Sequence, residues 1–277
     1  MLTVLFASIG SFIGEISASI IKFETDHHKE SIYTAGFINM LLGTAAFLLL
    51  ASFRGSFVFA AASLPTFIPR AVLEIIQAQM SMLALMKSDR STYVFLRNLT
   101  IPFLLIVDLF LGFSVSSYQW IGITVIFGIF AIVVWYHVLN FRGAFYPIFT
   151  AVNAVATISL FKYNITYFNS VEGDQIVMSS ILIIYFFLAA KIFRNENPLR
   201  FLKNKLFLGQ GIFHAIASIF GSFAFFLGNP GIAVTAERAS AVLAGIISGH
   251  NYFQEHKFGS KLIVSLGLIV GLALLTR

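Results

Sequence analysis

Long apolar runs separated by short polar connectors recur along the whole chain. Each is close to the roughly 20 residues that an α-helix needs to cross the hydrocarbon core of a bilayer. Ten such runs cover residues 2–22, 32–53, 68–86, 92–113, 118–138, 144–162, 176–193, 206–227, 232–252 and 258–275. This pattern predicts an all-α, polytopic membrane protein with ten transmembrane helices.

The two halves of the chain share one pattern. Aligning residues 88–134 with 228–274 places Arg97 on Arg238 and, after a four-residue slip, Gly112 on Gly249. Five helices per half is an odd number, so the second copy begins on the opposite side of the membrane. We therefore expect 5+5 inverted repeats, 1–140 and 141–277, within a single integral membrane domain, an organisation common among secondary transporters.

Composition supports a lipid environment. Of the 277 residues, 58% are apolar and only 11% are charged, less than half the charge of an average soluble protein. The chain has no cysteine, which excludes disulfides, thiolate metal sites and thiol catalysis. The basic residues are scattered rather than gathered in a stripe with interleaved aromatic residues, so nucleic-acid binding is unsupported.

The basic residues in the predicted loops indicate an orientation. The even-numbered loops and the C-terminus hold four: Arg54, Arg70, Lys162 and Arg277. The odd-numbered loops hold twelve: Lys22, Lys29, Lys87, Arg90, Arg142, Lys191, Arg194, Arg200, Lys203, Lys205, Lys257 and Lys261. Because cytoplasmic loops carry an excess of lysine and arginine, this count predicts both termini outside the cytoplasm.

Several positions resemble the drug/metabolite transporter superfamily, and specifically its ten-helix EamA-type members. They are Lys22 and Lys162 at the end of the first helix of each half, Pro102 in the fourth helix, Thr235-Ala236 and the Gly249 to Glu255 segment around the ninth, and Gly267 and Gly271 in the last. The resemblance implies a central cavity lined by spans one, three, four, six, eight and nine. It also implies cytoplasmic termini, against the charge count.

The chain departs from that family at two places. The first half lacks the acidic residue after Gly112, and no arginine lies near Asn39 in the second helix. A second, local resemblance links Glu15 and Lys22 to the first helix of small multidrug resistance proteins, which use a glutamate there to exchange protons for substrate. Here the two residues are seven positions apart, one fewer than that family leads us to expect.

Acidic and polar residues inside the apolar runs are candidates for function, because ionisable groups at mid-membrane are costly. Glu15 suits proton binding and release; alternatively, it is hydrogen-bonded to Ser17, Ser19 or another helix. Glu74 is a second candidate for proton coupling and for substrate binding. Gln77 and Ser81 lie on the same helical face, which points to a cavity; alternatively, Glu74 pairs with Arg70.

Arg97 and Arg238 form the strongest candidate pair. A guanidinium keeps its charge at ordinary pH and must find an anion, a carbonyl or water. We predict that they bind substrate, together with Glu74, Gln77, Tyr93 and His214; the last of these can titrate near neutral pH. Alternatively, the arginines pair with Asp89, Glu237 or another carboxylate, and His214 is only hydrogen-bonded. Asp108, near the end of its span, is expected to be an interfacial charge.

These observations favour a secondary active transporter at the plasma membrane, the inner membrane in a bacterium. It would move a small polar or amphipathic metabolite, amino-acid-like or otherwise anionic or zwitterionic, by alternating access coupled to protons or to exchange. Multidrug or cation efflux by proton antiport is the alternative, followed by a passive channel or a membrane-embedded enzyme. We expect no enzymatic activity, cofactor or metal; the partners would be a small-molecule substrate and the bilayer, with a monomeric or homodimeric state.

Overall fold

The computed structural model describes residues 2–26, 31–104, 116–228 and 230–275, and every regular element in these ranges is a helix. The α-helices are α1 (Leu2–Asp26), α2 (Ile32–Arg54), α3 (Leu64–Lys87), α4 (Arg90–Leu96), α6 (Ser117–Trp135), α7 (Phe145–Tyr167), α8 (Val171–Arg194), α9 (Lys205–Leu227), α10 (Pro230–Phe253) and α11 (Phe258–Leu275). Short 3-10 turns are η1 (Ala61–Ser63), η2 (Arg97–Leu99) and η3 (Pro198–Lys203). The all-α prediction is confirmed for these residues.

Six helices of the described chain are long and apolar enough to cross a membrane: α1, α2, α7, α8, α9 and α10. The apolar parts of α6 and α11 are shorter. α3 has 24 residues but carries Arg70 and Glu74. The fourth predicted span is described only as far as residue 104, so Asp108 and Gly112 lie outside the described residues. The helices identify a multi-pass membrane protein, and the full set of ten spans stays a prediction.

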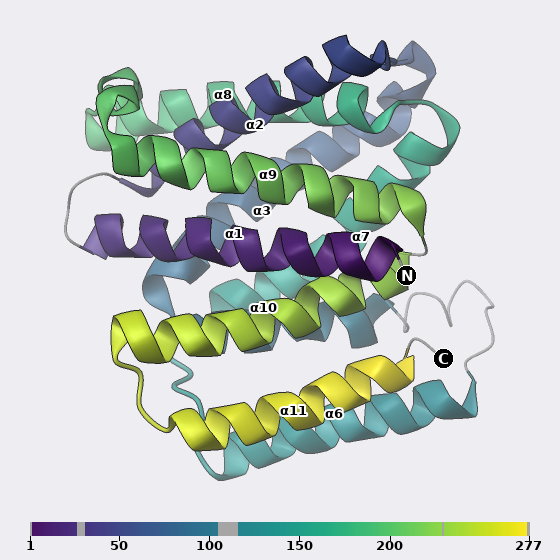
Figure 1. The fold of residues 1–277 in the computed structure, drawn as a ribbon, viewed down its shortest axis with the longest axis vertical. Coiled ribbons are helices and arrows are strands. Elements are labelled where there is room, and N and C mark those ends of the chain that lie inside the picture. The colour runs from purple at the N-terminus through teal and green to yellow at the C-terminus, as the bar shows by residue number, and fades with distance from the viewer. Residues whose placement is uncertain (1, 27–30, 105–115, 229, 276–277) are drawn as a thin grey trace.

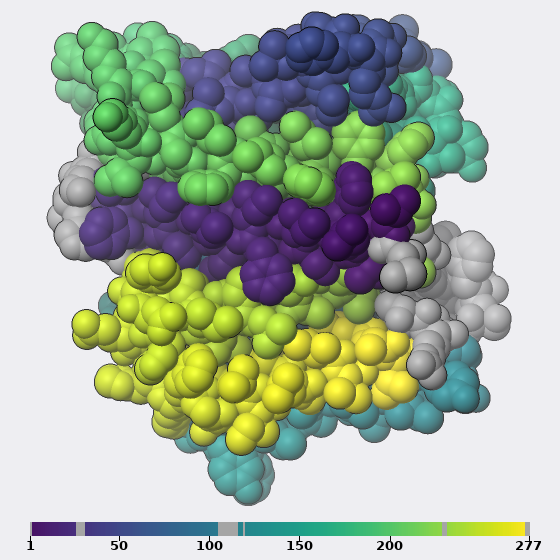
Figure 2. All heavy atoms as spheres, in the orientation of Figure 1, coloured from purple at the N-terminus to yellow at the C-terminus, as the bar shows by residue number. Residues whose placement is uncertain are grey.

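The helices lie side by side, with the start of α1 and the end of α11 on the same side of the bundle (Figure 1). α1 packs between α9 and α10, as the space-filling view also shows (Figure 2). α2 packs against α8 and α9, α3 against α7, α4 against α10, and α6 against α11. Large apolar side chains face outward, among them Phe53, Trp135 and Ile263, as expected of a surface solvated by lipid.

α2 and α8 begin and end in the same way. Ser31 and Ser170 are their N-cap residues, and each hydroxyl accepts a hydrogen bond from the backbone N–H three positions on, at 3.4 and 3.0 Å. Such a bond satisfies one of the amide groups that lack a partner in the first turn. The C-cap residues Gly55 and Asn195 are both left-handed, with φ of +59° and +53°. Glycine and asparagine are the residues that adopt this conformation most readily.

The fourth helix is interrupted at the residues of interest. Its α-helical part ends at Leu96, Arg97–Leu99 form a 3-10 turn, and helix resumes at Thr100. Pro102 lacks an N–H and its ring crowds the carbonyl of Asn98 four positions earlier, so a regular helix cannot run through this segment. The side-chain amide of Asn98 donates hydrogen bonds to two backbone carbonyls of the preceding turn, at 2.8 and 3.1 Å. Arg97 is thus the first residue of the tightened turn.

Candidate functional site

A cavity of about 490 Å³ lies among the helices. The helices at the predicted spans one, three, four, six, eight and nine all line it, and α2 and α8 contribute as well. The structure brings every predicted site residue to this one cavity: Glu15, Glu74, Gln77, Tyr93, Arg97, His214 and Arg238. Residues from both halves of the chain thus share a polar interior within an apolar helical bundle.

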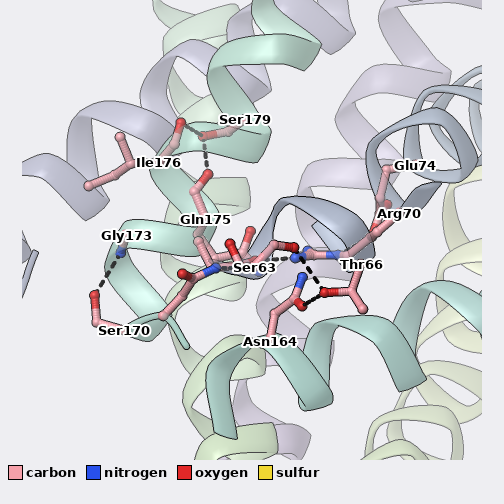
Figure 3. A network of polar contacts seen from close by, with 12 residues as sticks. Ser63, Thr66, Arg70, Glu74, Asn164, Ser170, Gly173, Gln175, Ile176 and Ser179 are labelled. Atoms are coloured by element: carbon pink, nitrogen blue, oxygen red, sulfur yellow. Dashed lines mark hydrogen bonds and ion pairs between the residues drawn. The ribbon is translucent and has the colours of Figure 1, made fainter. Parts of the chain in front are cut away.

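Arg70 links two carboxylates where α3 meets α8 (Figure 3). The guanidinium is only 2% exposed; its Nη1 is in close contact with fully buried Asp174, and its Nε lies 3.6 Å from Glu74 Oε1. It also stacks 4.6 Å from the ring centroid of Phe161 on α7. The Arg70–Glu74 pair, which the sequence offered as the alternative to a cavity, is therefore the longer of the two contacts. The single positive charge of Arg70 therefore lies close to two negative carboxylates.

Glu15 is held by other helices, not by Ser17 or Ser19. Its Oε1 accepts hydrogen bonds from Arg90 on α4, through Nε at 3.1 Å and through Nη2, and from Ser248 Oγ on α10 at 3.1 Å. Arg90 is fully buried, so its assignment to a loop was wrong: it is the first residue of α4 and faces inward.

Arg97, which is half-buried, and the buried Arg238 each make one side-chain hydrogen bond within the described residues. Arg97 donates to Tyr93 Oη at 3.1 Å, and no carboxylate of the described residues lies within 4.0 Å of it. Among the described residues, the one ion pair of Arg238, which is 3% exposed, is with the carboxylate of its neighbour, with Nη1 3.1 Å from Glu237 Oε1. Its Nε is buried and has no hydrogen-bond partner in the described chain. The Tyr93 ring centroid is 5.2 Å from the guanidinium carbons of both Arg90 and Arg97.

Gln77 and His214 line the cavity with their polar groups already engaged in part. Gln77 donates to the carbonyl of Thr150 at 3.1 Å and accepts from Asn153 Nδ2 at 2.8 Å. The amide thereby bridges α3 to α7. His214 Nε2 lies 3.4 Å from Ser218 Oγ, one turn further along α9.

Glu255, in the connector between α10 and α11, caps α4 from the other half of the chain. Its Oε1 accepts from the Arg90 N–H at 2.6 Å, and its Oε2 accepts from Lys261 Nζ at 2.9 Å and from the Ser91 hydroxyl. Burial raises the pKa of this carboxyl, but the hydrogen bonds from Lys261 and Ser91 outweigh that effect and hold the pKa below its usual 4.5. Asp89, the N-cap residue by position, makes no side-chain cap.

Four basic residues counted as loop charges are in fact buried: Lys22, Arg70, Arg90 and Lys261. Each contacts a partner inside the protein, such as the Ser88 carbonyl, 2.8 Å from Lys22 Nζ. Omitting them leaves nine basic residues against three, so the bias on which the orientation rests keeps its direction.

Sequence reasoning missed Arg90 and Asp174, which pair with the cavity residues Glu15 and Arg70. Their partners are 75 and 104 positions away in the chain, so no local spacing indicates the pairs. The chain has only 12 acidic residues, and a buried arginine requires one of them nearby. That shortage was the one signal that could have drawn attention to Asp174.

The fold and cavity define a multi-pass helical membrane protein with a charged interior. No protein-family model matches the chain, and a search of curated proteins found no match.

Proposed function

We propose that this protein is a secondary active transporter that moves a small polar or amphipathic solute by alternating access. The supporting observation is the cavity itself: Arg97, Arg238 and Glu74 line a space enclosed by apolar helices from both halves. Buried charges of this kind are costly and mark substrate or ion pathways in membrane proteins. The described residues form six helices long enough to span; we propose ten spans in all.

Helix packing supports the proposed inverted repeats. If α1, α2, α3, α4 and α6 correspond to α7, α8, α9, α10 and α11, several of the larger contacts have a counterpart, although α2 packs on α9 far more extensively than α8 packs on α3. The α1–α9 contact corresponds to α7–α3, and the α1–α10 contact corresponds to the packing of α7 on α4 and η2. The α2–α8, α4–α10 and α6–α11 contacts each map onto themselves. This is the pairing expected of two copies related by an axis in the membrane plane.

A pair of lysines supports the same correspondence at the level of single bonds. Lys22 Nζ donates to the Ser88 carbonyl at 2.8 Å, and Lys162 Nζ to the Gly228 carbonyl at 3.3 Å. Lys162 follows Lys22 by 140 positions, and Gly228 follows Ser88 by the same 140. The caps of α2 and α8 correspond as well, since both start at serine and end at a left-handed residue.

We propose membership of the drug/metabolite transporter superfamily, among its EamA-type members, and location in the plasma membrane. The family proposal rests on Lys22, Lys162 and Pro102, the positions of the sequence resemblance. The location rests on the apolar helices. The charged cavity supports a transport function, but it does not by itself point to a particular family or membrane.

Proton coupling is proposed for Glu15 or Glu74, and the geometry favours Glu74. Neutralising Glu15 would leave the fully buried Arg90 guanidinium without its counter-ion, which is strongly destabilising. Glu74 has no hydrogen bond from Arg70 at 3.6 Å, and Arg70 keeps Asp174 as a close partner. A proton can therefore occupy Glu74 at much smaller cost.

Counterflow in proteoliposomes tests the proposal. Purified protein is reconstituted with a high internal concentration of each member of a metabolite panel, and entry of the same radiolabelled solute is followed. Saturable, transient accumulation is expected for at least one solute, and Glu74→Gln should abolish its response to a pH gradient while the protein remains folded. Flux that never saturates and shows no counterflow would indicate a channel. Conversion of a solute would indicate an enzyme.

Cation or multidrug efflux by proton antiport is the second candidate, because Glu15 and Glu74 both line the cavity. Arginines in the same space weigh against it, since a fixed positive charge repels cationic substrates. Efflux of permanently charged quaternary ammonium dyes from inverted vesicles, sensitive to a pH gradient, would favour this candidate over the first.

A further inference from the structure

The charged groups that line the cavity, taken together with their direct partners, fall into three clusters with different formal charges. Glu15 and Arg90 form a neutral pair. The single charge of Arg70 faces two carboxylates, Glu74 and Asp174, so that cluster carries a formal charge of −1.

The third cluster has the opposite charge. Arg97 and Arg238 both line the cavity beside Glu237, which is the one carboxylate within 4.0 Å of either among the described residues. This cluster carries a formal charge of +1. The cavity as a whole is formally neutral, but its positive and negative charges are unevenly distributed.

The positive cluster has hydrogen-bonding capacity that the protein does not use. Arg238 Nε is buried without a partner in the described chain, and Arg97 uses one nitrogen, toward Tyr93. A buried donor without a partner is costly, and guanidinium groups bind carboxylates through two parallel hydrogen bonds. A carboxylate therefore fits this cluster in both charge and geometry.

The negative cluster is open to a cation at Glu74. This side chain is 24% exposed and lies 3.6 Å from Arg70, beyond hydrogen-bond distance. Asp174, in contrast, is fully buried and in close contact with the same guanidinium. Glu74 is thus the carboxylate of this cluster that can accept a hydrogen bond from a cationic group within the cavity.

We infer that the cavity binds a zwitterionic solute, with its carboxylate on Arg97 and Arg238 and its protonated amine on Glu74. The inference rests on the proposed transport function. A monoanion would leave the negative cluster without a counter-charge, and a monocation would leave the positive cluster without one. A zwitterion provides a counter-charge for both clusters. Because an amine and a proton compete for Glu74, substrate binding and proton binding exclude each other there.

Thermal stability of the purified protein in detergent provides the test. A panel of free amino acids with small, aliphatic and aromatic side chains identifies the most stabilising zwitterion. That amino acid is then compared with its N-acetyl derivative, its amide and its N-acetyl amide, which remove one charge or both. We expect the zwitterion to bind about tenfold more tightly, or better, than each singly blocked form, because one charge-assisted hydrogen bond contributes about that much.

Two variants test which cluster binds which charged group of the solute. Arg238→Gln should remove the difference between the amino acid and its amide, and Glu74→Gln the difference between the amino acid and its N-acetyl derivative. Arg238→Lys, which keeps the charge and loses the planar fork, serves if the glutamine variant does not fold. Arg200→Gln, an exposed arginine outside the cavity, should leave both differences unchanged.

The inference is overturned if a singly charged form binds as tightly as the zwitterion, if no member of the panel binds, or if the two variants lose the same difference. Counterflow distinguishes this failure from failure of transport itself. Saturable counterflow of a solely anionic or solely cationic metabolite would support the transport function and contradict the zwitterion site. Absence of counterflow for every solute, with the binding pattern intact, would support the zwitterion site and contradict the transport function.

Discussion

The buried ion pair between Glu15 and Arg90 makes a quantitative prediction about stability. Arg90 is fully buried and donates to Glu15 through two nitrogens, and Ser248 adds a third hydrogen bond to the same oxygen. Removing one partner of such a pair leaves a charge buried without compensation, which costs about 3–5 kcal/mol. Glu15→Gln and Arg90→Met should each destabilise the protein by an amount in this range.

The double variant should cost far less than the sum of the two single variants. With both charges gone no uncompensated charge remains, so the coupling free energy should be about 2 kcal/mol or more. The assay is equilibrium unfolding in mixed micelles with increasing SDS, followed by the fluorescence of Trp120 and Trp135 on α6. Single variants that cost under about 1 kcal/mol, or effects that simply add, would refute the idea of a tightly coupled pair.

Three further predictions concern other parts of the molecule. Glu255→Gln should remove a stabilisation that is present at neutral pH. The pKa of this carboxyl is lowered in the folded protein, so its contribution to the free energy of unfolding is present above the ordinary pKa and is lost as the pH falls through the folded pKa. The stabilities of the wild type and the variant should therefore converge in unfolding experiments at low pH. Gly10→Ala should destabilise by about 1–3 kcal/mol, because the added Cβ would lie 3.1 Å from the backbone of α9 at the Ala217 carbonyl; unchanged SDS unfolding would show that the α1–α9 contact gives way easily. Single cysteines introduced at Arg54 and Arg200 into this cysteine-free chain should react with an impermeant maleimide from opposite sides of the membrane, and labelling from one side would contradict the inverted repeat.

Apolar patterning predicted the helices well because a spanning helix needs little besides length and hydrophobicity. The run at 258–275 coincides with α11 at both ends, and the run at 32–53 ends one residue before α2 does. The same patterning could not indicate that the fourth helix tightens at Arg97–Leu99, since that break depends on Pro102 and the side chain of Asn98. The position of Arg97 at the start of this turn is therefore known only from the structure.

The predicted site residues lie together because charges excluded from lipid have few other places to go. Glu15, Glu74, Arg97 and Arg238 were found in this way, and all line the cavity. How they pair was beyond reach, since Arg90 and Asp174 lie close to helix starts and look like interfacial charges in the sequence. Long-range pairing is a property of how the helices pack, which no local pattern encodes.

The balance of charges in the cavity has an electrical consequence. The site and its direct partners include four basic and four acidic side chains: Arg70, Arg90, Arg97, Arg238, Glu15, Glu74, Asp174 and Glu237. Moving one elementary charge through a membrane potential of 100 mV changes its energy by about 2.3 kcal/mol, but a neutral site that changes its exposure from one side to the other moves none. In the proposed transporter, the voltage across the membrane would therefore act on the solute and the coupling ion, and the empty protein would reorient equally well in either direction.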